Sequence, residues 1–196
     1  MREMNVMIVG VGGQGTLLAS RVIGSAAAAS GYDVKVSEVH GMSQRGGSVV
    51  TYVRFGENIA SPLIDKGCAD ILFSFEKLEA LRFIDYLKPN GTLIVNDQQI
   101  DPMPVITGKE KYPDGVMNML INSKHKTVAA NAAKIALDCG DIRAVNIVLI
   151  GVLAGMNITG IDTKVWEDAV RNCVPAKALE INLKAFNKGL ERGSGN

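Results

Sequence analysis

The chain has 196 residues, of which 47% are hydrophobic and 21% are charged, a size and balance that suit one packed α/β domain over 1–196. Its 21 basic and 20 acidic side chains leave a formal net charge of +1, so we expect no nucleic-acid partner. The longest apolar stretch, 147–156, is far shorter than the roughly 20 residues that span a bilayer, and residues 1–9 do not resemble a signal peptide. These features predict a cytoplasmic protein without a membrane partner.

The first half of the chain alternates apolar runs with amphipathic segments, and glycine or proline turns separate many of them. In chain order, the pattern predicts a strand at 5–9, a helix at 16–30, strands at 34–39, 48–55 and 71–74, a helix at 76–87 and a strand at 92–96. Strands that alternate with helices are typical of a doubly wound, Rossmann-like α/β sheet whose strands are mostly parallel.

The second half begins with a proline-containing stretch, 97–126, that lacks clear periodicity. Within it we predict a strand near 103–106 and leave the apolar piece at 116–121 unassigned. Helices are then predicted at 127–139, 146–155, 162–173 and 176–190, with Asp162 as the N-cap of the third. These helices predict a helical C-terminal layer on the sheet.

Cysteine spacing limits the metal chemistry open to this chain. Cys68, Cys139 and Cys173 are widely separated and form no CxxC pair, so their spacing cannot build a zinc or iron–sulfur site. We interpret them as buried apolar cysteines in a reducing compartment and predict no metal bound by this chain.

A GxGxxG pattern lies between the first strand and the first helix, where such glycines allow a tight turn and expose helix amides to an anion. Its residues are Gly10, Gly12, Gly13, Gln14 and Gly15. Glu38, at the end of the second predicted strand, is placed to hold a ribose, so bound NAD or FAD is one interpretation. The others are a phosphate-bearing ligand at a subunit boundary, and close strand-to-helix packing with the turn facing a partner protein.

The polar loop, residues 40–47, concentrates hydrogen-bonding groups between the second and third strands. It contains His40, Ser43, Gln44, Arg45, Gly46 and Gly47. Arg45 can clamp a carboxylate or phosphate, His40 can transfer a proton, and Gln44 can orient either group, so His40 and Arg45 are the candidate catalytic residues. A purely structural role for the loop is the alternative.

Hydrolase chemistry has no support in the sequence, because no GxSxG elbow or HExxH helix is present. The only other histidine, His125, lies between Lys124 and Lys126. We therefore expect it at a solvated surface position.

Several longer motifs identify a family. They are GVGGQG (10–15), EVHGMSQRGGSV (38–49), SPLI (61–64), AD (69–70), FEKLEALRF (75–83), LKPNGTLIVN (87–96), RAVNIVLIG (143–151) and EINLKAFNKG (180–189). They resemble the gamma subunit or domain of pyruvate and 2-oxoglutarate ferredoxin oxidoreductases, and within that superfamily are most similar to the beta subunit of indolepyruvate ferredoxin oxidoreductases. The similarity covers nearly the whole chain.

The resemblance implies a small subunit in a hetero-oligomer with a large (alpha) catalytic subunit. Such complexes decarboxylate an aryl 2-oxoacid oxidatively to an acyl-coenzyme A and pass the electrons to ferredoxin. The resemblance places thiamine diphosphate, magnesium and the iron–sulfur clusters in the large subunit, makes coenzyme A a co-substrate of the complex, and leaves the isolated chain inactive. The chain also lacks the GDG and NN segments of a usual thiamine diphosphate site, since residues 139–142 are the nearest approach.

Two other functions stay open at this point. A free-standing NAD- or FAD-dependent oxidoreductase would bind its dinucleotide as an isolated chain. A structural assembly subunit without a ligand would tolerate alanine in both glycine-rich loops.

Overall fold

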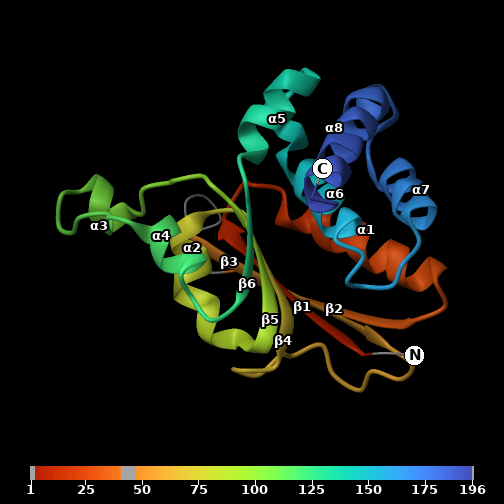
Figure 1. Cartoon of the computed structure of the whole chain (residues 1–196), viewed down its shortest axis with the longest axis horizontal. Helices are drawn as coiled ribbons and strands as arrows, with labels where there is room; N and C mark the ends of the chain where they lie inside the picture. The colour runs from red at the N-terminus through yellow and green to blue at the C-terminus, as the bar shows by residue number, and fades with distance from the viewer. Residues whose placement is uncertain (1–2, 41–46, 196) are drawn as a thin grey trace.

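The computed structural model describes residues 3–40 and 47–195. In this part of the chain the strands form one six-stranded sheet with the order β2-β3-β1-β4-β5-β6, shown in Figure 1. The strands are β1 (Met4–Val11), β2 (Asp33–His40), β3 (Ser48–Gly56), β4 (Ala69–Ser74), β5 (Leu87–Asn96) and β6 (Lys126–Ala130). β1, β4, β5 and β6 pair in parallel, whereas β3 runs antiparallel to β1 and β2. The predicted mostly parallel α/β sheet is confirmed.

One face of the sheet is covered by a layer of helices, seen together in Figure 1. They are α1 (Thr16–Ala29), α5 (Ala132–Cys139), α6 (Val145–Gly155), α7 (Thr163–Cys173) and α8 (Leu179–Gly193), with short 3₁₀ turns at Ile142–Ala144 (η2) and Ala176–Ala178 (η3). α6 is apolar on all sides and buried from Asn146 to Ala154, because it is enclosed by α8, α5, α1 and the sheet. This layer confirms the predicted helical C-terminal layer.

The opposite face carries a smaller apolar cluster. It is covered by α2 (Lys77–Phe83), the 3₁₀ turn η1 (Ile84–Tyr86) and α4 (Val116–Ile121), while α3 (Met103–Ile106) projects away from the body of the protein (Figure 1). Helices on both faces make the sheet doubly wound, as predicted.

Glycines bring α6 and α8 into close contact. A Cβ atom at Gly151 would lie 2.1 Å from the carbonyl oxygen of Phe186, and one at Gly189 would lie 2.0 Å from that of Val148. Gly155 and Gly193 face the opposite helix in the same way. The two backbones therefore touch along this crossing, and no larger residue fits at these positions without moving a helix.

Two sequence-based assignments were wrong. Residues 103–106 form the short helix α3 and not a strand, because Pro102 and Pro104 fix backbone angles that begin a helical turn. The predicted helix 127–139 is divided: its first residues form strand β6 beside β5, and α5 begins only at Ala132, where the Asn131 side chain accepts a hydrogen bond from the Lys134 amide at 3.0 Å. Thr127 and Val128, both β-branched, favour the strand.

Single-residue expectations had mixed outcomes. Asp162 caps α7 as predicted, accepting a hydrogen bond from the Lys164 amide at 2.8 Å. His125 is buried, with 8% of its surface exposed, so its predicted surface position was wrong. The prediction of buried cysteines is confirmed for Cys139, whereas Cys173 is only partly buried and the prediction is wrong for Cys68, which is exposed.

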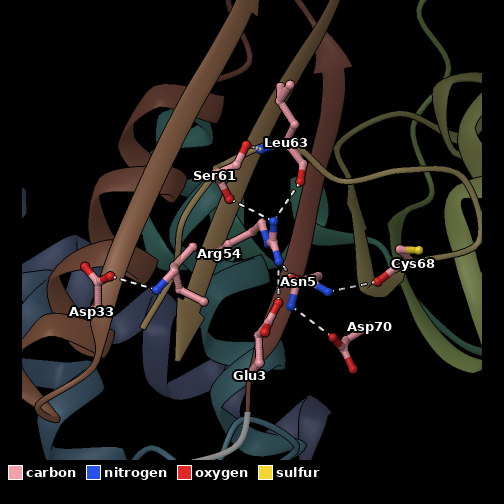
Figure 2. Close-up of polar contacts among 9 residues, drawn as sticks. Glu3, Asn5, Asp33, Arg54, Ser61, Leu63, Cys68 and Asp70 are labelled. Atoms are coloured by element: carbon pink, nitrogen blue, oxygen red, sulfur yellow. Dashed lines mark hydrogen bonds and ion pairs between the residues drawn. The ribbon is translucent and has the colours of Figure 1, made fainter. Parts of the chain in front are cut away.

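Residues from several of the sequence motifs described above lie close together at the end of the sheet where β1 begins (Figure 2). Arg54, on β3, donates hydrogen bonds to the carbonyl oxygens of Ser61 and Leu63 at 2.8 and 3.0 Å, and to the Asn5 side chain at 2.8 Å, and it pairs with Glu3. The Asn5 amide in turn donates to the Asp70 carboxylate at 2.9 Å, which also pairs with Lys88. The SPLI, AD and LKPNG motifs therefore contribute to a structural network at the edge opposite the glycine turn.

Candidate functional site

The glycine turn connects the end of β1 to the start of α1. Gly13 and Gly15 have left-handed backbone angles, with φ of 100° and 82°, which L-residues with a side chain rarely adopt. A Cβ atom at Gly15 would also lie 2.5 Å from the side-chain nitrogen of Asn146. Glycine is thus favoured at position 15 by its left-handed conformation, and an added Cβ atom there would also displace the Asn146 amide group.

The Gln14 amide group is engaged inside the turn. Its oxygen accepts a hydrogen bond from the Val11 amide at 2.7 Å, and its nitrogen donates to the Phe75 carbonyl at 3.1 Å and to Gln98 at 3.3 Å. Asn96 joins this network by donating to the same carbonyl and to Gln98. The turn is therefore tied to the carboxyl ends of β4 and β5. A ligand-binding role for Gln14 stays a prediction.

A hollow of about 410 Å³ lies above the glycine turn, lined among others by Gly13, Gly15, Gln98, Arg143 and Asn146. Among the described residues, no side chain caps the amino end of α1, so its first amide groups and the positive end of the helix dipole favour an anion there. Arg143 is exposed at the rim, paired with Asp141 at 2.6 Å. The hollow has the chemistry to hold a phosphate group.

The sheet order bears on the predicted ribose-binding role of Glu38. In a dinucleotide-binding fold the strand that carries the ribose-binding acid lies directly beside β1. Here β3 lies between β1 and β2, so Glu38 is two strand spacings away, about 10 Å, and its carboxylate accepts a hydrogen bond from Ser20 of α1 at 3.3 Å. The NAD or FAD interpretation therefore loses its geometric basis.

The polar loop begins and ends at well-defined points beside the glycine turn. The His40 backbone pairs with Val49 in the β2–β3 ladder, and the Gly47 carbonyl accepts a hydrogen bond from the Gly12 amide at 2.9 Å. The two glycine-rich segments singled out in the sequence thus meet at the carboxyl end of β1. Between these points, the His40 side chain and Ser43, Gln44, Arg45 and Gly46 lie outside the described residues, and their roles stay predictions.

Two buried carboxylates lie next to the end of the polar loop. Glu76 and Glu79, at the start of α2, have only 1% and 4% of their surfaces exposed. The Ser48 hydroxyl donates to Glu79 at 2.5 Å, and Arg82 pairs with Glu79 at 3.2 Å. Burial raises the pKa of Glu79 above its ordinary value, and the hydrogen bond from Ser48 and the charge of Arg82 partly oppose that shift.

Glu76 connects α2 to the segment that carries α3. Its carboxylate accepts hydrogen bonds from the Glu79 amide at 2.9 Å, from the Ile100 amide at 3.3 Å and from the Tyr112 hydroxyl at 2.5 Å. Burial, followed by the bond to Glu76, raises the pKa of Tyr112. A cavity of about 310 Å³ adjoins both carboxylates and is also lined by Ser48 and Arg82.

Sequence reasoning missed this carboxylate pair. The signal was present, since Glu76 follows a buried strand and the pair has the spacing of adjacent helix turns. A buried acid directly after a parallel strand is a candidate site residue. The partners, Ser48 and Tyr112, are 31 and 36 residues away along the chain and could not be assigned to it from spacing.

The sequence of this chain matches a known protein family. Residues 5–192 match the family described as pyruvate ferredoxin/flavodoxin oxidoreductase, and the chain belongs to that family.

Its relatives and structural neighbours include subunits of oxoacid oxidoreductases. The chain is 41% identical to the indolepyruvate oxidoreductase subunit IorB of Thermococcus kodakarensis, over 97% of this chain and 96% of the relative, and 38% identical to that of Archaeoglobus fulgidus, over 95% and 94%. The keto/oxoacid ferredoxin oxidoreductase gamma subunit of Geobacter sulfurreducens has a similar structure, with a TM-score of 0.74 and 25% identity over 98% of this chain and 99% of that one. A 2-oxoglutarate:ferredoxin oxidoreductase from Magnetococcus marinus, solved with 2-oxoglutarate, coenzyme A and succinyl-CoA bound, shares the fold at 18% identity and a TM-score of 0.76, over all of this chain and 32% of that one.

Proposed function

We propose that this chain is the small subunit of a 2-oxoacid:ferredoxin oxidoreductase of the indolepyruvate type. The carrying observation is the similarity to indolepyruvate oxidoreductase subunits over nearly the full length of both chains. The substrate of the complex is then an aryl 2-oxoacid such as indolepyruvate, which is decarboxylated oxidatively to an acyl-coenzyme A. Ferredoxin accepts the electrons, and a large catalytic subunit completes the hetero-oligomer in the cytoplasm.

The large subunit carries thiamine diphosphate, magnesium and the iron–sulfur clusters in this proposal. Two observations support this placement of the metal groups: the three cysteines lie on separate segments, and no grouping of three or more His, Cys, Asp or Glu side chains in residues 3–40 and 47–195 could hold a metal ion. Across the same residues, no helix combines the length and apolar character needed to cross a bilayer. In this proposal, the chain contributes its two glycine-rich loops to the complex.

The glycine turn and the polar loop face the active site of the partner subunit or a coenzyme A channel in this proposal. Ligands of open α/β sheets bind at the carboxyl ends of the strands, and the glycine turn and the two described ends of the polar loop, at His40 and Gly47, lie at that end of β1. The hollow above the glycine turn suits a phosphate of coenzyme A, because it combines the amino end of α1 with Arg143. In the polar loop, Arg45 holds an anionic group, Gln44 orients it, and His40 moves a proton.

Co-expression with the large subunit tests the proposal. We expect oxoacid-dependent reduction of ferredoxin only when both chains are present, and we expect Arg45→Ala to lower turnover while the subunit stays folded and assembled. Equal activity of the large subunit without this chain would contradict the proposal.

A structural assembly subunit is the alternative that one observation favours, because the Gln14 amide bonds to its own protein and not outward. In that case Arg45→Ala assembles and turns over like the wild type. Binding of NAD or FAD by the isolated chain would instead support the free-standing oxidoreductase.

A further inference from the structure

A short arm, residues 101–111, leaves the body of the protein between β5 and α4 and carries α3 (Figure 1). Nine of its eleven residues are exposed and none is buried, so packing within this chain does not account for its apolar residues. Four of these are consecutive and form α3. Met103 is 60% exposed and Ile106 is 64% exposed. A run of unburied apolar residues of this length is disfavoured in water unless another surface covers it.

The arm has a defined shape and a fixed base. Within it, the Lys109 amide donates a hydrogen bond to the Pro104 carbonyl at 2.9 Å. At its base, the buried Glu76 carboxylate accepts hydrogen bonds from the Ile100 amide at 3.3 Å and from the Tyr112 hydroxyl at 2.5 Å, so one side chain holds both ends of the arm. A surface that is ordered before it binds loses less conformational entropy on binding. The arm is therefore preorganised for a contact.

The arm begins at the same end of the sheet as the glycine turn, because it follows the carboxyl end of β5. Met103 of the arm and Val11, the last residue of β1, line the same cavity of about 310 Å³. At the glycine turn itself, Leu17 and Ile142 are 50% and 46% exposed, and Ile142 lines the hollow above the turn. Exposed apolar side chains thus occur on the arm and on the neighbouring surface, which faces the large subunit in the proposed function.

The size of the arm indicates what kind of partner covers it. A stable interface uses roughly 20–30 residues on each side, whereas the arm has eleven. Two copies of this chain that touched only through their arms would fall short of that size. A partner that covers both the arm and the strand ends can reach it, and in the proposed function that partner is the large catalytic subunit.

We propose that the arm is a docking element for the large catalytic subunit, and that Met103 and Ile106 enter an apolar recess on that subunit. Methionine is enriched in protein interfaces, and a few anchors buried at the centre of an interface carry most of its binding free energy. In this scheme the arm contributes to assembly and touches no reacting atom. The inference rests on the proposed function, because it requires that a large subunit binds this chain.

The test measures the Kd between the purified large subunit and variants of this chain. Met103→Glu and Ile106→Glu each place a charge where an apolar contact is expected, and we expect each to raise Kd by about 10- to 100-fold. Both side chains are exposed in the isolated chain, so both variants should unfold in urea like the wild type.

Leu63→Glu is the matched control. Leu63 is 59% exposed and lies at the opposite end of the sheet, where β1 begins, so the same change of charge there should leave Kd unaltered. A photoreactive benzoylphenylalanine placed at position 106 gives a second readout that does not depend on a charge. Irradiation of the assembled complex should then link position 106 to the large subunit, and the same group at position 63 should not form that link.

Each outcome decides the question. A raised Kd in the two arm variants, with an unaltered control and a cross-link from position 106 to the large subunit, supports the docking role. A wild-type Kd in the arm variants, an equal loss in the control, or a cross-link from position 106 to a second copy of this chain or to added ferredoxin overturns it, while the proposed function stands because the wild-type complex is active. A wild-type chain that does not bind the large subunit would instead remove the proposed function, and this inference with it.

Discussion

Replacing Gly151 by alanine tests how tightly α6 and α8 are packed. The new Cβ atom would lie 2.1 Å from the Phe186 carbonyl oxygen and 2.9 Å from both Gly189 Cα and the Leu190 amide nitrogen. Non-bonded heavy atoms need about 3.5 Å, and every obstructing atom belongs to the backbone, so no side chain can rotate away. The two helices must therefore move apart by about 1 Å at this buried crossing.

The expected cost follows from two opposing effects. Overpacking a core costs about 1–3 kcal/mol, and the upper end applies here because backbone must move. Alanine favours a helix over glycine by about 1 kcal/mol. We therefore expect Gly151→Ala to lower the free energy of unfolding by about 2 kcal/mol, which in a chain of this size corresponds to a fall in Tm of about 4–8 °C.

Gly24 in α1 provides the matched control. A Cβ atom there would be 3.7 Å from Val34 and 3.8 Å from Val36, which are ordinary contacts. Gly24→Ala should therefore raise the free energy of unfolding by about 0.5–1 kcal/mol. Urea unfolding followed by circular dichroism measures both variants. If Gly151→Ala is as stable as the wild type, the backbone contact does not constrain the helices and the reasoning is wrong.

Two further predictions concern stability. Burial, with a smaller effect of Lys124, holds the pKa of His125 below its ordinary value. Below about pH 6.5 the unfolded chain therefore binds a proton that the folded chain does not. The free energy of unfolding should then fall as the pH drops towards the lower pKa of the folded state. His125→Gln should show a smaller fall in unfolding experiments over that range, and an unchanged slope would contradict the assignment. Arg54→Ala removes the bonds that hold residues 61–63, so we expect a loss of about 2–4 kcal/mol and faster proteolysis in 57–68. Arg171→Ala, which removes only an exposed pair with Glu167, should cost about 0.5 kcal/mol or less, and equal losses in the two arginine variants would show that the Arg54 network is not structural.

Local features of the sequence were sufficient to predict most of the elements. The run before Gly10 and the Ala-rich segment after Gly15 specify β1, the turn and α1 by composition and period alone. β6 was missed because Ala129 and Ala130 lead into the Ala-rich start of α5, so that the two β-branched residues before them were assigned to the same helix. Pairing with β5 extends the strand over Lys126–Ala130. Local propensity cannot report pairing with a strand whose residues lie 34 positions earlier in the chain, as Thr92 does relative to Lys126.

The order of the first three strands was also open to sequence reasoning, and the inference was not drawn. The connection between β2 and β3 spans only 41–47, too short for a parallel crossover of about 10 residues or more. It therefore requires an antiparallel hairpin. If β3 also pairs with β1, this hairpin places β3 between Glu38 and the glycine turn.

The site was predictable only in part, because its contacts depend on which strands are neighbours in the sheet. Glycine spacing marked the turn, and the density of polar groups marked the loop. The contacts that join them, from Gly12 to Gly47 and from Ser48 to Glu79, connect segments that are far apart in the sequence. They exist because β1 and β3 are neighbours, and the sheet order is a property of the whole chain.

The glycine contact between α6 and α8 also has a consequence for folding during protein synthesis. During synthesis α6 is complete about 40 residues before α8, which at typical translation rates is a wait of roughly 2–8 s. Throughout that interval an almost wholly apolar helix lacks the partner that encloses it. A nascent chain paused there would expose apolar surface of the kind that makes folding intermediates prone to aggregate.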